Sequence, residues 1–136
     1  MNDGKKNVGV LLVGHGSKEP YNREAVRCFA ESLRGEYGYV GYAFIQIDQP
    51  NILSALEDAS RSGVDELVVQ PVFLTRGIHV DRDIPELLGL PADSRSGAIM
   101  AGGREIKVFY GMPLGTDDRI LEIIKDRIRE ASGAGL

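Results

Sequence analysis

Apolar residues along this chain follow two patterns, which are short continuous runs and repeats at helical spacing. A short continuous run that ends at a glycine or a polar residue is typical of a strand buried on both faces of a parallel sheet. Such runs, rich in β-branched and aromatic residues, alternate along the chain with segments of the other kind. We expect four strands, at Val8–Val13, Tyr39–Ile47, Leu67–Leu74 and Ile106–Tyr110.

The helical repeats lie between and after these runs. Pro20 stands where the first turn of a helix tolerates proline, and the repeat after it ends at Gly35. A second repeat ends at Gly63, a short helix is expected around Asp83–Leu88, and Thr116 is expected to cap the last helix. The apolar stripe of that last helix consists of Ile120, Leu121, Ile124 and Ile128.

Regular alternation of strands and helices predicts parallel strands joined by right-handed crossovers, with helices on both faces of the sheet. The fold class is α/β, and the expected strand order is 2-1-3-4, as in flavodoxin-like folds. Residues 1–136 form one domain, in which residues 91–103 have no clear periodicity and are interpreted as a mobile insertion. Pro71 lacks an N–H, so we expect it near the end of its strand or at a bulge.

Composition narrows the classes of function. The chain has 136 residues and a net charge of −4, with 16 basic against 20 acidic side chains, which argues against nucleic acid as a partner. It has one cysteine, Cys28, which we place in the core and which fits a reducing compartment. No apolar run approaches the roughly 18–20 residues of a membrane span, so we expect a cytoplasmic protein without a membrane partner.

The two histidines are the first candidates for chemistry. His15 lies in a Gly-His-Gly-Ser turn directly after the first strand, and His79 lies in the loop after the third. In the expected topology both loops open at the crevice beyond the carboxyl ends of the strands, where such sheets bind ligands. One histidine at a strand end is often only a structural hydrogen-bonding residue, but two that converge favour a functional site.

Two neutral imidazoles suit divalent ions such as Co²⁺, Ni²⁺, Fe²⁺ and Zn²⁺. They leave coordination positions open, which favours transient capture over a structural metal. Ser17 and the start of the first helix are candidates for binding an anion, helped by basic residues if these face the crevice. At the end of the second strand, alternation places Gln46 and Asp48 on one face. Asp83 is interpreted as a charge at a helix N-terminus. The basic candidates are Lys18, Arg23, Arg76 and Arg82.

Three segments in order resemble the small sirohydrochlorin chelatases, the short single-domain form found mainly in archaea. They are LLVGHGSKEPYN at 11–22, QPVFLTRGIHVDRDIPELLGL at 70–90 and PLGTDDRI at 113–120. The resemblance implies insertion of Co²⁺ or Ni²⁺, as the metal substrate, into sirohydrochlorin, a tetrapyrrole that bears eight carboxylates. It implies no permanently bound cofactor, and it implies a homodimer with the active site near the subunit interface.

Carried over residue by residue, the resemblance makes His15 and His79 the metal-handling and catalytic residues. The basic candidates and Ser17 would then bind substrate carboxylates, in a loop that includes Gly77. Many family members have glutamates where this chain has Gln46 and Gln49, which leaves the proton acceptor open, with Asp48 as one substitute. Residues 91–103 contain no histidine that would store metal. The apolar floor for the macrocycle would come from Phe44, Phe73, Leu74 and Ile78.

Two other functions compete with a chelatase. The same crevice would serve a carrier that binds a tetrapyrrole or a metal without catalysis. The Gly-His-Gly turn also resembles the Arg-His-Gly of histidine phosphatases, but Gly14 stands where those enzymes have arginine, which counts against phosphoryl transfer. The sequence has no Gly-x4-Gly-Lys-Ser/Thr phosphate loop, so the expected chelatase needs no ATP.

Overall fold

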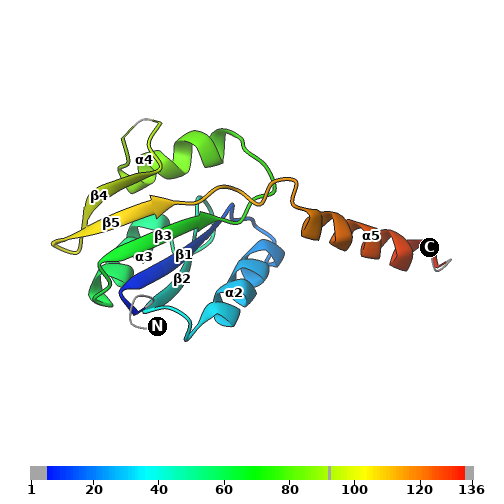
Figure 1. The fold of residues 1–136 in the computed structure, drawn as a ribbon, viewed down its shortest axis with the longest axis horizontal. Helices are drawn as coiled ribbons and strands as arrows, with labels where there is room; N and C mark the ends of the chain where they lie inside the picture. Colours follow the sequence, from blue (N-terminus) through cyan, green and yellow to red (C-terminus); the bar gives the residue numbers. More distant parts are fainter. Residues whose placement is uncertain (1–5, 92, 134–136) are drawn as a thin grey trace.

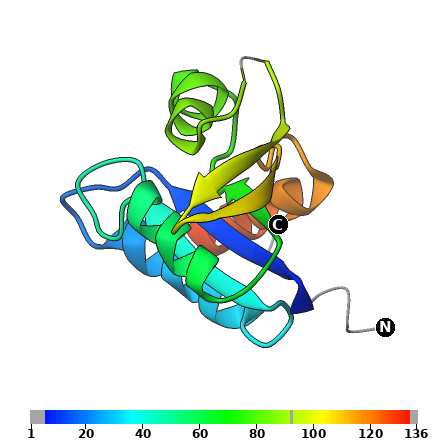
Figure 2. The same cartoon turned by 90° about the vertical axis from the view of Figure 1, so that its left-hand side faces the viewer.

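The computed structural model describes residues 6–91 and 93–133, and these form one sheet flanked by helices (Figures 1 and 2). The strand order in the described chain is β2-β1-β3-β5-β4. The strands are β1 (Val8–Gly14), β2 (Tyr39–Phe44), β3 (Glu66–Pro71), β4 (Ser96–Ala101) and β5 (Arg104–Tyr110). The helices are α2 (Tyr21–Leu33), α3 (Ile52–Arg61), the π-helical turn η1 (His79–Asp83), α4 (Ile84–Leu88) and α5 (Asp118–Ser132).

The α/β class, the parallel pairing of the four expected strands and their spatial order are confirmed. Interpretation of residues 91–103 as an insertion was wrong, because Ser96–Ala101 forms a fifth strand antiparallel to β5. Ile99 and Ala101 are buried whereas Met100 is exposed, which is the two-residue period of a strand. Small residues made this alternation hard to detect in the sequence.

Two strands are shorter than expected. β2 ends at Phe44 rather than Ile47, because Ile47 has a positive φ of 65° that no strand accommodates. β3 ends at Pro71 rather than Leu74. This agrees with the expectation that a proline without an N–H sits at a strand end.

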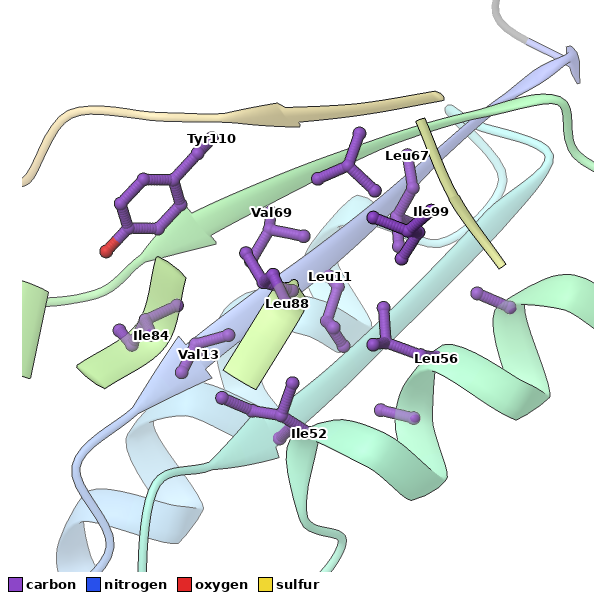
Figure 3. Close-up of a cluster of buried hydrophobic side chains, with 14 of the residues drawn as sticks. Leu11, Val13, Ile52, Leu56, Leu67, Val69, Ile84, Leu88, Ile99 and Tyr110 are labelled. Carbon is purple, nitrogen blue, oxygen red and sulfur yellow. The ribbon is translucent and has the colours of Figure 1, made fainter. Parts of the chain in front are cut away.

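The two faces of the sheet have separate cores. Side chains of β1 alternate between them, so that Leu11 and Val13 join a large cluster with α3 and α4, while Val10 and Leu12 pack with α2. Figure 3 shows the larger cluster, in which leucine, isoleucine and valine side chains from the sheet meet those of α3 and α4. Helices therefore lie on both faces, as expected for a parallel sheet.

Helix α2 turns Val26 and Ala30 toward the sheet, and these are its buried residues. Cys28 lies two positions from each of them on the helix and is exposed, as is Phe29. The placement of Cys28 in the core was therefore wrong. Among the described residues, no helix combines the length and apolar content that crossing a membrane requires.

Helix α5 begins one residue later than expected. Asp117, not Thr116, is the N-cap, and its carboxylate accepts a hydrogen bond from the Arg119 amide at 2.9 Å. Hydrogen bonds from the Arg119 side chain hold the pKa of Asp117 well below its ordinary range. The expected apolar stripe is present, but no residue of α5 is buried, and the helix projects away from the sheet (Figure 1).

Replacement of Leu67 tests the larger core. Leu67 is fully buried in β3, so Leu67→Ala leaves a cavity and should lower the free energy of unfolding by about 2–5 kcal/mol. Leu53→Ala is the matched control, because Leu53 is 59% exposed on α3. Urea denaturation measures both, and an equal loss in the two variants would contradict this description of the core.

Candidate functional site

The candidate site lies where the loops after β1 and β3 begin side by side. The two strands are paired up to Val13 and Pro71, and the Val72 amide then donates to the Val13 carbonyl at 2.8 Å. These loops bring the His15 and His79 rings together, with ring centres 4.8 Å apart and planes at 72°. The expected convergence of the two histidines is confirmed.

Each imidazole is oriented by a group that only accepts hydrogen bonds. Nδ1 of His15 lies 2.8 Å from the Gly16 carbonyl oxygen, and Nδ1 of His79 lies 2.8 Å from Oδ2 of Asp83. A carbonyl or an ionised carboxylate offers no proton, so in each neutral ring Nδ1 carries the hydrogen and donates it. The Nε2 lone pair of both rings is then available to a metal ion or a proton.

Asp83 is the residue of this site that sequence reasoning missed, since its charge was assigned to a helix N-terminus. It lies in η1 together with His79, where the Ile84 amide bonds back to the His79 carbonyl across five residues. Single π-helical turns are frequent at functional sites. The detectable signal was the four-residue spacing of His79 and Asp83, which places the two side chains on one face of a helical turn.

The turn η1 is fixed to the sheet by one buried hydrogen bond. The Tyr110 hydroxyl, at the end of β5, donates to the Val80 carbonyl at 2.6 Å. Burial of the ring raises the pKa of Tyr110 to about 12. The position of His79 therefore depends on both β3 and β5.

The turn that carries His15 requires a glycine. Gly16 has a φ of +88°, and a Cβ at this position would lie 1.8 Å from the Gln46 carbonyl oxygen. The Gly16 amide donates to Oδ1 of Asn22 on α2 at 3.1 Å, and the Gln46 amide donates to the His15 carbonyl at 3.2 Å. His15 is thus held between α2 and the loop that follows β2.

That loop contains a strained γ-turn centred on Ile47. The Asp48 amide donates to the Gln46 carbonyl at 2.7 Å while Ile47 has a φ of 65°, a conformation rare for a β-branched residue. Strain of this kind costs on the order of 1–3 kcal/mol and clusters at functional sites. The turn places the Gln46 amide nitrogen 3.4 Å from Nε2 of His15, so this exposed side chain must move when Nε2 binds an ion.

The Asp48 side chain is largely buried and contacts Ser17 and Arg23 rather than the two histidines. Its side chain is only 9% exposed, and Oδ2 accepts from the Ser17 amide at 2.9 Å. Oδ1 lies 3.7 Å from the Arg23 guanidinium. The Ser17 amide and part of the Arg23 charge are therefore engaged by Asp48, which leaves Asp48 poorly placed to replace a glutamate as proton acceptor.

The other basic candidates lie on the exposed surface around the histidines. Arg76 pairs with Asp81 at 3.2 Å, and Arg82 pairs with Asp83 at 3.3 Å. Exposed ion pairs contribute little stability, so either guanidinium can exchange its partner for a ligand carboxylate at small cost. Lys18 is also exposed, directly after the His15 turn.

Phe44 does not belong to the expected apolar floor. It is 1% exposed and packs against α2, because the face of β2 that carries it is covered by that helix. Phe73 does lie beside the site, with its ring centre 6.3 Å from that of His15. Leu74, Gly77 and Ile78 lie in the same loop and are exposed. Ile47 on the γ-turn is a further exposed apolar side chain, which sequence reasoning missed.

The two imidazoles are the strongest candidate metal ligands at this edge of the sheet. No group of three or more His, Cys, Asp or Glu side chains within residues 6–91 and 93–133 is arranged to hold a metal ion. An imidazole nitrogen binds Zn²⁺ at about 2.0–2.1 Å, so rings 4.8 Å apart are close enough to share an ion of that kind. Such an ion keeps most of its coordination positions for water or for a ligand.

The fold and the site together define an α/β protein with a mostly parallel sheet and two converging histidines at its topological switch point. The CbiX family model matches residues 9–131, and the chain belongs to this family.

Among curated proteins, the sirohydrochlorin cobaltochelatase of Methanopyrus kandleri is 39% identical over 140 residues, covering 93% of this chain and 98% of its own. The sirohydrochlorin cobaltochelatase of Methanothermobacter thermautotrophicus is 38% identical over 135 residues, covering 93% of this chain and 94% of its own. Among solved structures, the sirohydrochlorin chelatase SirB of Bacillus subtilis subspecies spizizenii, in complex with cobalt, has a TM-score of 0.72 and 23% identity. The match covers 90% of this chain and 50% of the SirB chain, and at this identity it shows a common fold.

Removal of the Tyr110 hydroxyl tests the anchor of η1. Tyr110→Phe leaves the buried Val80 carbonyl without its donor, so we expect the free energy of unfolding at pH 7 to fall by about 1–3 kcal/mol. Tyr21→Phe is the control, because Tyr21 is largely exposed on α2.

The same hydroxyl predicts a pH dependence. The pKa of Tyr110 is raised from 10.0 to about 12. The neutral hydroxyl therefore contributes its full share of the free energy of unfolding below pH 10, and this share is lost as the pH rises toward 12. Wild type should therefore lose stability across this range relative to Tyr110→Phe, as measured by urea denaturation at several pH values. Parallel curves for the two proteins would contradict the assignment.

Proposed function

We propose that this protein is a sirohydrochlorin chelatase that inserts Co²⁺ or Ni²⁺ into its tetrapyrrole substrate without ATP. The observation that carries the proposal is the pair of imidazoles, each with Nδ1 engaged and Nε2 available, on rings 4.8 Å apart. The names of the relatives in Methanopyrus kandleri and Methanothermobacter thermautotrophicus support sirohydrochlorin as the substrate.

In the proposed reaction the metal ion is itself a substrate. His15 and His79 bind it through Nε2 while water fills the remaining positions. Two neutral ligands hold a divalent ion less firmly than a complete protein site would, which allows a pyrrole nitrogen to replace first a water and then an imidazole. Each ligand exchange moves the ion from the protein toward the macrocycle.

Insertion of one divalent ion releases two pyrrole N–H protons. Gln46 carries an amide and accepts no proton at neutral pH, and the Asp48 carboxylate is engaged by Ser17 and Arg23. The imidazole that leaves the metal regains a free Nε2 lone pair and takes a proton there. We therefore assign proton acceptance to His15 and His79 as well as metal delivery.

The exposed apolar residues around the histidines suit one edge of a flat macrocycle. Phe73, Leu74 and Ile78 would contact its rings. Lys18, Arg76 and Arg82 would pair with the carboxylates at its rim, where charge-assisted hydrogen bonds are strong.

Imidazole ligands accept both Co²⁺ and Ni²⁺, so the product would serve either cobalamin synthesis or the nickel tetrapyrrole of methanogenesis. The resemblance to small chelatases supports a homodimer as the active form. A cytoplasmic location is part of the same proposal and is consistent with one exposed, unbridged cysteine, Cys28.

Anaerobic, absorbance-monitored insertion of Co²⁺ and of Ni²⁺ into sirohydrochlorin tests the proposal. His15→Ala and His79→Ala each remove a metal ligand and should lower the insertion rate by more than about 100-fold, beyond the 10–100-fold typical for loss of an outer-shell partner. Ser32→Ala is a control on the exposed side of α2 and should leave the rate unchanged. Tetrapyrrole binding without turnover in the wild type would instead favour a carrier.

The carboxylate behind His79 provides a second test. Asp83→Ala frees the His79 ring to rotate and to change tautomer, so the affinity of the protein for Co²⁺ should fall by roughly 10–100-fold. Asp81→Ala is the matched control, since Asp81 lies in the same turn and pairs with Arg76 rather than with His79. Titration calorimetry with Co²⁺ alone measures both, and equal affinities would remove Asp83 from the site.

A further inference from the structure

Arg95 is an arginine whose charge has no carboxylate partner in the part of the chain that the structure describes. It directly precedes β4 and is held by the end of β5. Its guanidinium lies over the Tyr110 ring, 4.9 Å from the ring centre, and Nη2 donates to the Gly111 carbonyl at 2.7 Å. The Tyr110 amide donates to the Arg95 carbonyl at 2.8 Å. The guanidinium is therefore held in position while its charge is not neutralised.

Arg95 lines a hollow of about 200 Å³ beside the turn η1. Segments that are distant in the sequence form its walls, namely the loop after β3, η1, the segment before β4 and the end of β5. The wall residues include Arg76, Asp81, Asp93, Ser94, Arg95 and Tyr110. Drug-sized ligands occupy about 300–1,000 Å³, so this hollow accepts an acidic side arm of a ligand rather than a whole cofactor.

The two arginines of the hollow differ in the partners of their charges. Arg76 pairs with Asp81 at 3.2 Å, in an exposed ion pair that contributes little stability and can be exchanged. Within the described residues, Arg95 donates only through Nη2, so its other N–H donors are available to a ligand. A guanidinium binds a carboxylate through two parallel N–H donors, and such pairs are among the strong hydrogen bonds of proteins.

The hollow adjoins the candidate site across η1. Arg76 stands three residues before His79 in the same loop, and Asp81 stands two residues after it. Side chains two positions apart on a helical turn do not face each other. One side of η1 therefore carries His79 with its partner Asp83, and another side, with Asp81, borders the hollow. A large ligand that is held at His79 and extends past Arg76 reaches the hollow.

We propose that this hollow is a subsite for one carboxylate of the tetrapyrrole, with Arg95 as its main partner and Arg76 as its second. The proposal deepens the proposed function and rests on it for the identity of the ligand. The macrocycle lies over the histidines, and one of its acidic side chains passes Arg76 into the hollow. The carboxylate there meets a guanidinium that the Tyr110 ring and the Gly111 carbonyl already orient, which lowers the ordering cost of binding.

Replacement of Arg95 tests the subsite through the affinity for sirohydrochlorin, measured anaerobically by absorbance titration without metal. Arg95→Gln removes the charge, and the affinity should fall by about 10-fold, because a hydrogen-bonded charge pair is lost. Arg95→Lys keeps the charge and should lose less. Lys107→Gln is the matched control, since Lys107 also lies over an aromatic ring of β5, that of Phe109 at 5.1 Å, but on the other face of the strand.

Two further measurements distinguish binding by Arg95 from a structural role. In the proposed subsite the difference between wild type and Arg95→Gln shrinks at high salt, where exposed charges are screened. The affinity of Arg95→Gln for Co²⁺ alone should equal that of the wild type, because the hydrogen bond from Tyr110 to Val80 still holds η1. A variant that is folded by far-UV circular dichroism but binds Co²⁺ more weakly would show that Arg95 acts through Tyr110, and would overturn the proposal.

Inorganic phosphate distinguishes a substrate carboxylate from a free anion, which would offer the same charge and acceptors. Calorimetry with phosphate is compared for wild type and Arg95→Gln. Phosphate binding that depends on Arg95, together with an unchanged affinity for sirohydrochlorin, would show a site for a free anion and overturn the subsite. Equal sirohydrochlorin affinities without phosphate binding would overturn it as well.

The failure of this proposal is distinguishable from the failure of the proposed function, because the titration needs no metal. A protein that binds sirohydrochlorin through Arg95 and inserts no metal would refute the chelatase and leave the subsite intact. A protein that inserts metal, and whose affinity for sirohydrochlorin is the same in Arg95→Gln, would refute the subsite and leave the chelatase intact.

Discussion

The parallel pairing of β1 with β3 is the constraint on which the rest of the site depends. It places two loops, far apart in sequence, at the same edge of the sheet, and the hydrogen bond from the Val72 amide to the Val13 carbonyl extends the pairing beyond the last strand residue. His15 follows directly from the end of β1, and the loop after β3 brings His79 beside it, where the hydrogen bond from the Tyr110 hydroxyl to the Val80 carbonyl fixes η1. The imidazoles are therefore held in place before any ion arrives, which reduces the ordering that capture requires.

Backbone geometry and hydrogen-bond acceptors orient the two imidazoles. Gly16 allows the His15 turn to approach the Gln46 carbonyl, and the strained γ-turn at Ile47 directs Gln46 and Asp48 in different directions. The Gly16 carbonyl and the Asp83 carboxylate select the same tautomer in both rings. A site with two fixed nitrogen donors leaves most coordination positions of an ion open and is suited to passing the ion on, whereas a complete ligand set would retain it.

The two sides of the sheet are stabilised in different ways. On one side α3 and α4 cover the strands and carry η1, so the position of His79 depends on the main hydrophobic core through Tyr110 and Val80. On the other side α2 packs on β1 and β2. Helix α5 projects away from the sheet (Figure 1). The site therefore rests on the side of the sheet that α3, α4 and η1 cover.

The sequence by itself determined four of the five strands, the helices between them and their order, because continuous apolar runs and repeats at helical spacing are local features of the chain. It also predicted that His15 and His79 meet, since that follows from the order of strands alone. It did not reveal β4, whose small residues weaken the alternation, nor the burial of Phe44, nor the pairing of Asp83 with His79. Those features depend on which faces are covered and on how a π-helical turn aligns its side chains. Only the tertiary structure decided them, because contacts between distant segments, and not local periodicity, set the direction of α5 and the hydrogen-bond partner of each imidazole.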